Sequence, residues 1–127
     1  GQGKKTEAED WLKKAVAAHG NDARSHREYA NWLLNEGRVD AVGPELQTVE
    51  RLAPTDRDTL KLKGLYNRYR RNLPAAEQVF EELVRNYPGD SFAAWNLALT
   101  LADSNDPTKT KQRRAVELAE NEVRKNP

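Results

Sequence analysis

The chain has 127 residues, of which 21 are basic and 20 are acidic, so its net charge is +1. This balance creates no overall field to attract nucleic acid or an anionic membrane, and no apolar run reaches the roughly 18 residues of a membrane span. The absence of cysteine excludes disulfides and thiolate metal sites. A chain without cysteine fits a cytoplasmic location first and a periplasmic one as well, so the compartment stays open.

Seven helices are predicted along the chain. The first starts near Thr6, where Thr6 and Glu9 have the spacing of a capping box, and it ends at Gly20, which can adopt the left-handed conformation of a helix end. The third contains Pro44, which we expect in the first turn, where the N–H groups have no intrahelical partner. The predicted ranges are about 6–20, 22–36, 40–53, 56–70, 74–87, 91–103 and 111–125.

A single sequence period relates these helices. Segment 76–90 is apolar on one helical face and stops at a proline, and its Phe80 and Pro88 have counterparts one period earlier at Leu46 and Pro54. Two further columns repeat at this spacing, one of small residues and one of aspartates: Ala30, Gly64 and Ala98, then Asp22, Asp56 and Asp90. The small residues allow two helices to approach closely, and each aspartate can cap the helix that follows it. A fixed period of about 34 residues is typical of a helical repeat array.

These columns resemble the tetratricopeptide repeat family, whose units are helix–turn–helix hairpins with this period. The best repeat matches at Gly64, Ala76, Phe80 and Pro88. The repeats on either side match at Ala30, Leu33, Gly37, Leu46 and Pro54, and at Leu97, Ala98, Leu101, Ala115, Ala119 and Pro127. The resemblance covers essentially the whole chain. It implies an all-α, right-handed superhelix of antiparallel helical hairpins, an α-solenoid.

Some positions depart from the family's pattern. Lys63 and Asn67 replace apolar residues beside Gly64, and Glu122 stands in an apolar column of the last helix. We therefore expect the middle repeat to be rotated or loosely packed. The period divides the single domain 1–127 into the second helix of a partial repeat and three repeats: 4–20, 22–55, 56–89 and 90–127. Because the array starts within a repeat and lacks a polar capping helix, we expect the chain to be a fragment of a longer protein.

No catalytic or metal-binding pattern is present in the sequence. The only histidines, His19 and His26, lie seven residues apart on different predicted helices, which favours surface or packing roles. The sequence contains no phosphate-binding glycine loop, no nucleophile elbow and no His-Glu-x-x-His motif. We expect neither enzymatic activity nor a cofactor.

The resemblance also implies where a partner binds. In this family the first helix of each hairpin lines a concave groove that commonly holds an extended peptide or a helix. The residues placed there are Arg27 and Asn31, then Lys61, Leu65, Arg68 and Tyr69, then Phe92, Trp95, Asn96 and Leu99. Aromatic and arginine side chains are the usual energetic anchors of protein interfaces. The alternative is that helix 56–70 is rotated, so that Leu62, Leu65 and Tyr69 belong to the core.

Two narrower functions are disfavoured. A carboxylate clamp for the acidic tails of chaperones is matched by Arg27 and Asn31, but Leu62, Phe92 and Asn96 do not supply the rest. The segment 66–71, Tyr-Asn-Arg-Tyr-Arg-Arg, mixes aromatic and basic residues as single-strand binders do. It also lies at a predicted helix end, where cations interact favourably with the helix dipole, and the net charge of +1 favours that structural role.

The most favoured function is a non-catalytic protein–protein interaction scaffold that binds a peptide or helix of a partner protein in the groove. The alternative is self-association within a larger assembly, with a second copy covering the apolar side of the last helix at Val116, Leu118 and Val123. No membrane contact is indicated by the sequence.

Overall fold

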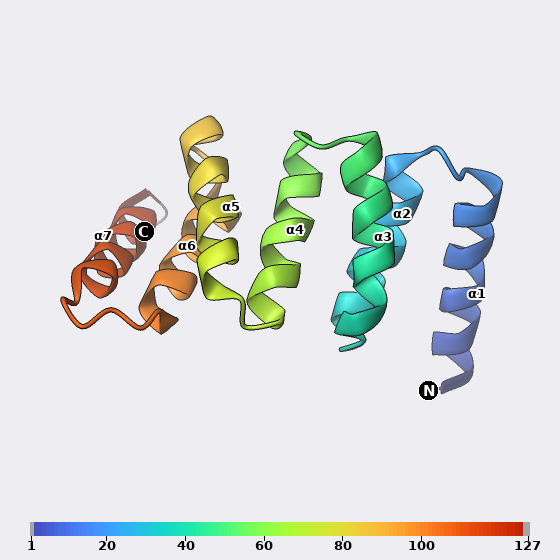
Figure 1. Ribbon diagram of the computed structural model, residues 1–127, viewed down its shortest axis with the longest axis horizontal. Helices are drawn as coiled ribbons and strands as arrows, with labels where there is room; N and C mark the ends of the chain where they lie inside the picture. The colour runs from blue at the N-terminus through green and yellow to red at the C-terminus, as the bar shows by residue number, and fades with distance from the viewer. Residues whose placement is uncertain (1, 126–127) are drawn as a thin grey trace. The chain divides into compact units, whose positions relative to one another are not determined.

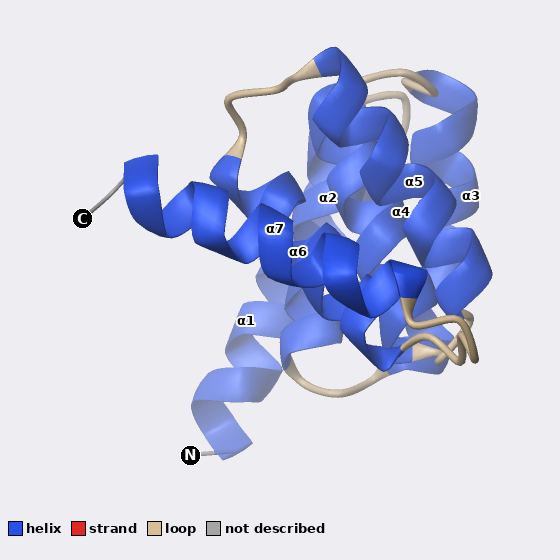
Figure 2. Cartoon of the chain, turned by 90° about the vertical axis from the view of Figure 1, so that its left-hand side faces the viewer, coloured by secondary structure: helices blue, strands red, loops and turns tan. Residues whose placement is uncertain are grey.

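A computed structural model describes residues 2–125, and these residues form seven α-helices (Figure 1). The helices are α1 Gln2–Ala18, α2 Ala23–Asn35, α3 Val39–Leu52, α4 Arg57–Tyr69, α5 Leu73–Asn86, α6 Ser91–Asp103 and α7 Thr110–Lys125. The described part of the chain contains helices and connecting loops but no strand (Figure 2). The predicted all-α fold is confirmed.

The contacts divide the chain into two compact units, residues 1–62 and 63–127, with the boundary inside α4. In the first unit α2 packs against α1 and α3, and in the second unit α6 packs against α5 and α7. Within each unit successive helices run in opposite directions (Figure 1). In these four pairs, helices that are neighbours in the sequence are also neighbours in space.

The core of the first unit is centred on α2. Tyr29, Ala30, Leu33 and Leu34 are buried there, and the first three have the three- and four-residue spacing of one helical face. The facing helix α3 and the start of α4 contribute the remaining buried apolar side chains: Val42, Leu46, Val49, Leu60 and Leu62.

Two buried polar side chains of α2 are also held by partners. His26 Nδ1 lies 2.5 Å from Glu45 Oε2, and His26 Nε2 lies 3.0 Å from the Gly20 carbonyl oxygen. The Tyr29 hydroxyl donates to Glu9 Oε2 at 2.8 Å, and burial together with this hydrogen bond raises the pKa of Tyr29 to about 12. Of the two roles expected for His26, surface or packing, the structure shows packing, since its imidazole is buried and contacts Glu45 of α3.

The core of the second unit is centred on α6, whose buried residues are mostly small. Phe80 of α5 is fully buried and its ring lies directly against Gly64 of α4. A Cβ atom added at Gly64 would lie 2.5 Å from Phe80 Cε1, so the small residue predicted here is required for the close approach of the two helices. The other buried apolar residues of this unit are Ala76, Val79, Leu83, Ala93, Ala94, Leu97, Ala98, Leu101 and Ala115.

Aspartate and proline begin several helices as predicted. The Asp22 carboxylate accepts a hydrogen bond from the Arg24 N–H, and Asp90 accepts one from the Ala93 N–H, both at 3.0 Å. Pro74 lies in the first turn of α5, where its missing N–H removes no intrahelical bond. These caps satisfy backbone donors that a helix start leaves free.

The loops after α2 and α4 share one backbone feature. Gly37 has φ of +76°, and Arg71, which stands one repeat period later, has φ of 62°. Both residues are in the left-handed region that favours glycine. The left-handed backbone conformation is therefore repeated one period later, although Arg71 carries a side chain and Gly37 does not.

Three predicted helix features are wrong. Helix α1 already covers the segment before Thr6, so Thr6 and Glu9 lie in the helix interior and do not form a capping box. Gly20 lies outside the left-handed region, because α1 ends at Ala18 and the chain continues through an ordinary turn. Pro44 lies in the second turn of α3 rather than the first, since the helix begins earlier than expected.

The polar residues in apolar columns are accommodated by hydrogen bonds. Asn67 donates from Nδ2 to the Lys63 carbonyl oxygen of its own helix at 2.9 Å. Glu122 is buried and accepts a hydrogen bond from Ser91 Oγ at 2.8 Å, with Lys125 Nζ at 3.2 Å. The hydrogen bond from Ser91 is the main reason that the pKa of Glu122 is lowered. A carboxylate can therefore replace an apolar residue in this column without a cavity.

Candidate functional site

In the second unit, the C-terminal half of α4 lies beside α6 and leaves one face of both helices open. A hydrogen bond from Arg68 Nη1 to Asn96 Oδ1, 3.3 Å long, joins the two helices there. We call this face the α4–α6 surface, formed by Leu65, Arg68, Tyr69, Phe92, Trp95, Asn96 and Leu99.

Large apolar and aromatic side chains of this surface are open to solvent. Tyr69 is 55% exposed, Trp95 41% and Leu99 47%. Trp95 and Leu99 are four residues apart on α6, as are Leu65 and Tyr69 on α4, so each pair lies on one helical face. In a chain with 32% charged residues and a mean hydropathy of −0.95, such a concentration of exposed apolar area indicates a binding surface.

Phe92 connects this surface to the core. Its ring makes an edge-to-face contact with buried Phe80, with 6.3 Å between the ring centroids. Phe92 itself is half-buried. Phe92 therefore packs the aromatic part of the surface against the core. Trp95 lies on the same helix, α6, and so has a fixed position relative to Phe92.

Arg68 and Asn96 form the polar part of the surface. Asn96 donates from Nδ2 to the Phe92 carbonyl oxygen at 2.9 Å, which directs its Oδ1 toward Arg68. The Nε of Arg68 is covered by the chain and has no hydrogen-bond partner among the described residues. The Arg68 guanidinium is thus half-buried and bonded to a neutral amide.

An ion pair that the sequence analysis missed also bridges these two helical segments. Arg71 Nη1 lies 3.7 Å from Asp103 Oδ2, just beyond the C-terminus of α4 and at the end of α6. The separation of the two residues in the sequence is close to the repeat period. The repeat period could have indicated this ion pair, since residues about one period apart lie on the first helices of successive hairpins.

The remaining predicted site residues lie in the first unit. Arg27 Nη1 donates to Asp56 Oδ2 at 3.2 Å, so Arg27 already has a carboxylate partner in its own chain. Asn31 is exposed on α2, and Lys61 is half-buried on α4. The structure thus brings together the predicted residues of α4 and α6 that follow Leu62.

Leu62 is not part of an exposed apolar patch. It is 1% exposed and belongs to the core of the first unit, so the core alternative is confirmed for this residue. Leu65 is half-buried, and Tyr69 is exposed. Leu62 therefore belongs to the core, whereas Tyr69 lies on the surface. The alternative of a rotated helix, which would place Leu62, Leu65 and Tyr69 together in the core, does not describe α4.

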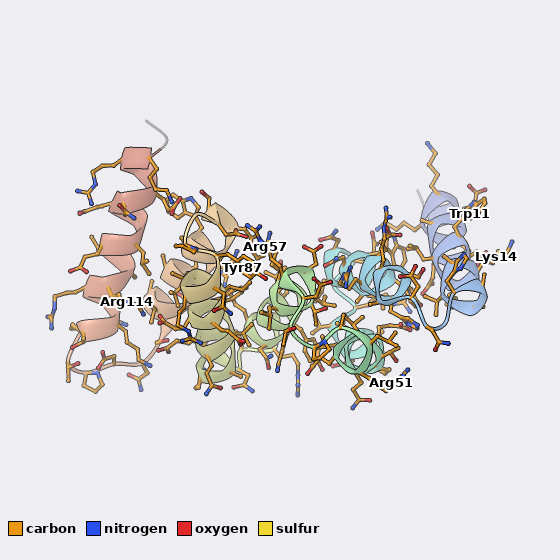
Figure 3. All side chains as sticks on the ribbon, turned by 90° about the horizontal axis from the view of Figure 1, so that it is seen from above. Trp11, Lys14, Arg51, Arg57, Tyr87 and Arg114 are labelled. Atoms are coloured by element: carbon orange, nitrogen blue, oxygen red, sulfur yellow. The ribbon has the colours of Figure 1, made fainter. Side chains whose placement is uncertain are left out.

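Two other parts of the surface are hollowed, one on α7 and one over α5. On α7, Val116 and Val123 are exposed around a shallow apolar hollow that also includes Ala119. Another hollow, of about 950 Å³, lies over α5 and is lined mainly by polar and charged side chains. Two ion pairs connect α7 to this face of α5 (Arg114 is labelled in Figure 3): Lys111 with Glu77, and Arg114 with Glu81. Since these acids already have cationic partners, the hollow over α5 is a weaker candidate than the α4–α6 surface.

The described residues include no cluster of His, Cys, Asp or Glu side chains that could hold a metal ion. Within the same residues, no helix has the length and apolar character required to cross a membrane.

No protein-family model and no curated protein matches the sequence. The resemblance to tetratricopeptide repeats therefore rests on the repeat columns, and a functional proposal must rest on the geometry of the α4–α6 surface.

Proposed function

We propose that this chain is a non-catalytic protein-interaction module that binds a peptide or helix of a partner protein on the α4–α6 surface. In this proposal the hairpins are tetratricopeptide-like units and the array forms a right-handed superhelix. The observation that carries the proposal is the joint exposure of Tyr69, Trp95 and Leu99 beside the Arg68–Asn96 hydrogen bond. Tryptophan, tyrosine and arginine are the residues that most often dominate binding energy.

The available burial area suffices for a measurable contribution. An aromatic side chain buries about 150–250 Å² in all, so the 41% of Trp95 that is exposed offers roughly 60–100 Å² to a partner. At about 25 cal/mol per Å² this area stabilises a complex by about 1.5–2.5 kcal/mol. Truncating Trp95 to alanine should therefore weaken binding by roughly 10- to 70-fold.

The test uses a random peptide library displayed on phage. Peptides enriched on the wild-type chain are synthesised, and their affinity is measured for the wild type and for Trp95→Ala combined with Tyr69→Ala. We expect helicity and melting to stay nearly unchanged while peptide binding is lost. The matched control is Trp11→Ala, because Trp11 of α1 is 76% exposed (Figure 3) and belongs to the first unit. Peptides that bind the double variant as well as the wild type would contradict the proposal, and a large loss of thermal stability would mean that these residues are core.

A second candidate is self-association through the last helix, which the exposed Val116 and Val123 favour. Replacing both valines by lysine should then convert an oligomer into a monomer in sedimentation-velocity experiments across a range of concentrations. A wild-type chain that is monomeric at every concentration removes this candidate.

A further inference from the structure

We propose that the partner segment on the α4–α6 surface carries an aspartate or glutamate side chain next to its apolar anchor, and that this carboxylate binds the Arg68 guanidinium. The inference rests on the proposed function, since it names the chemistry of the segment that the same surface binds. It adds a requirement that burial of Trp95 and Leu99 alone does not impose.

In the free chain, Arg68 has few of its hydrogen-bond donors satisfied. Its guanidinium is half-buried, its Nε is covered without a hydrogen-bond partner in the described part of the chain, and its Nη1 donates to the neutral Asn96. A guanidinium carries five N–H donors, so one hydrogen bond leaves most of its capacity unused. A partly desolvated cation without a counter-charge is costly, and a carboxylate is the group that fits its planar fork.

Other arginine and lysine side chains show the contrast. Arg27 has Asp56, Lys111 has Glu77 and Arg114 has Glu81. At the α4–α6 surface the nearby acid is already engaged, because Asp103 lies 3.7 Å from Arg71 Nη1. No carboxylate of the described residues is paired with Arg68, so a partner segment can supply its counter-charge.

The approach direction also follows from the geometry. Because the chain covers Nε, a ligand oxygen can reach Arg68 only at its terminal nitrogens. Asn96 holds one of these nitrogens on the α6 side, the helix that carries Trp95 and Leu99. A carboxylate bound there lies beside the apolar side chains, so the acid and the apolar anchor belong to one short segment.

The experiment repeats the phage selection with the peptides fused at their C-termini, so that carboxylates come only from side chains. Selections on the wild type and on Arg68→Gln are sequenced side by side, with Arg85→Gln as the control that removes an exposed charge from the same unit. We expect acidic residues to be enriched beside an apolar residue on the wild type and on Arg85→Gln, and this enrichment to disappear on Arg68→Gln.

Synthetic peptides then measure the effect without altering the protein. Replacing the acidic residue of a selected peptide by its amide should weaken binding to the wild type by about 10- to 100-fold, the range for a hydrogen bond to a charged group. The same replacement should have no effect on Arg68→Gln.

The outcomes separate the two proposals. Peptides that need Trp95 but show no acidic preference overturn this inference and leave the proposed function standing. Selected peptides that bind the wild type equally well after their acidic residue is replaced by its amide also overturn it, because the carboxylate then contributes nothing to binding. A selection that yields no Trp95-dependent peptide overturns the proposed function and the inference together.

Discussion

Gly64→Ala adds one methyl group at the closest helix contact in the second unit. The new Cβ atom would lie 2.5 Å from Phe80 Cε1 and 2.6 Å from Phe80 Cζ. Carbon atoms in favourable contact are about 3.5–4.0 Å apart, so the ring or the helix must move by about 1 Å. Phe80 is fully buried, and its surroundings leave little room for that movement.

Two opposing effects determine the magnitude. Overpacking a core costs about 1–3 kcal/mol, while alanine favours a helix over glycine by about 1 kcal/mol. Because the clash involves a buried ring rather than a flexible chain end, the steric cost should exceed the gain. We expect the free energy of unfolding of the second unit to fall by about 1–2 kcal/mol.

The assay follows urea unfolding by the fluorescence of Trp95 after Trp11 and Trp32 have been replaced by phenylalanine. Trp95 is then the only tryptophan and reports on the second unit. With a urea dependence of about 1–3 kcal/mol per M, the midpoint should decrease by roughly 0.5–1 M. The control is Gly3→Ala in α1, where no described atom lies within 4 Å of the added Cβ and no shift is expected in this signal.

Two results would contradict the predicted effect of Gly64→Ala. A Gly64→Ala variant as stable as the parent would show that the two helices are not in close contact. In a Phe80→Leu background, which removes the nearest ring atoms, Gly64→Ala should become neutral or stabilising by up to about 1 kcal/mol. If the substitution costs the same in both backgrounds, its effect does not arise from the contact with Phe80.

Three further predictions concern backbone conformation, a buried polar pair and acid stability. Arg71→Gly should raise the free energy of unfolding by about 0.5–1 kcal/mol, because glycine adopts the left-handed φ of 62° without the steric cost of a side chain. A lower urea midpoint for this variant than for the wild type would contradict the prediction. His26→Ala should lower it by about 2–3 kcal/mol, since Glu45 loses its buried partner, and a melting temperature equal to that of the wild type would show that the pair is not formed. The hydrogen bond from Ser91 lowers the folded-state pKa of Glu122 below the ordinary value of 4.5, so its stabilisation is present above that value and is lost as pH falls through the folded pKa. Urea midpoints measured from pH 6 to pH 3 should therefore fall more steeply for the wild type than for Glu122→Gln, and parallel profiles would exclude this linkage.

The helices could be predicted because their signals are local and periodic. Helix α6 spans the predicted range 91–103, and Asp90 caps it as expected. The start of α1 was placed too late, because Thr6 and Glu9 have capping-box spacing although the helix continues through them. Partners that are distant in sequence, such as Glu45 for His26, could not be predicted from spacing along one helix.

The candidate site was predicted less completely than the helices. The exposure of Trp95 and Tyr69 shows that both side chains lie outside the core, while their place in a groove stays a prediction. Leu62 and Leu65 could not be separated, since both have the same apolar character and only the three-dimensional packing distinguishes them. The sequence could not show that Arg68 bonds to a neutral amide and not to a carboxylate, because its contacts depend on the three-dimensional positions of the neighbouring side chains.

The packing of α2 on α1 and α3 has a consequence for how the chain folds. Helix α2 completes its contacts with α1 and α3, and the first unit draws on residues 1–62 alone. Contacts between neighbouring helices close short loops at a small entropic cost, and helical proteins of this kind fold within microseconds to milliseconds. Synthesis proceeds at only about 5–20 residues per second. The contacts of α2 with α1 and α3 can therefore form on the ribosome before α5, α6 and α7 have been translated.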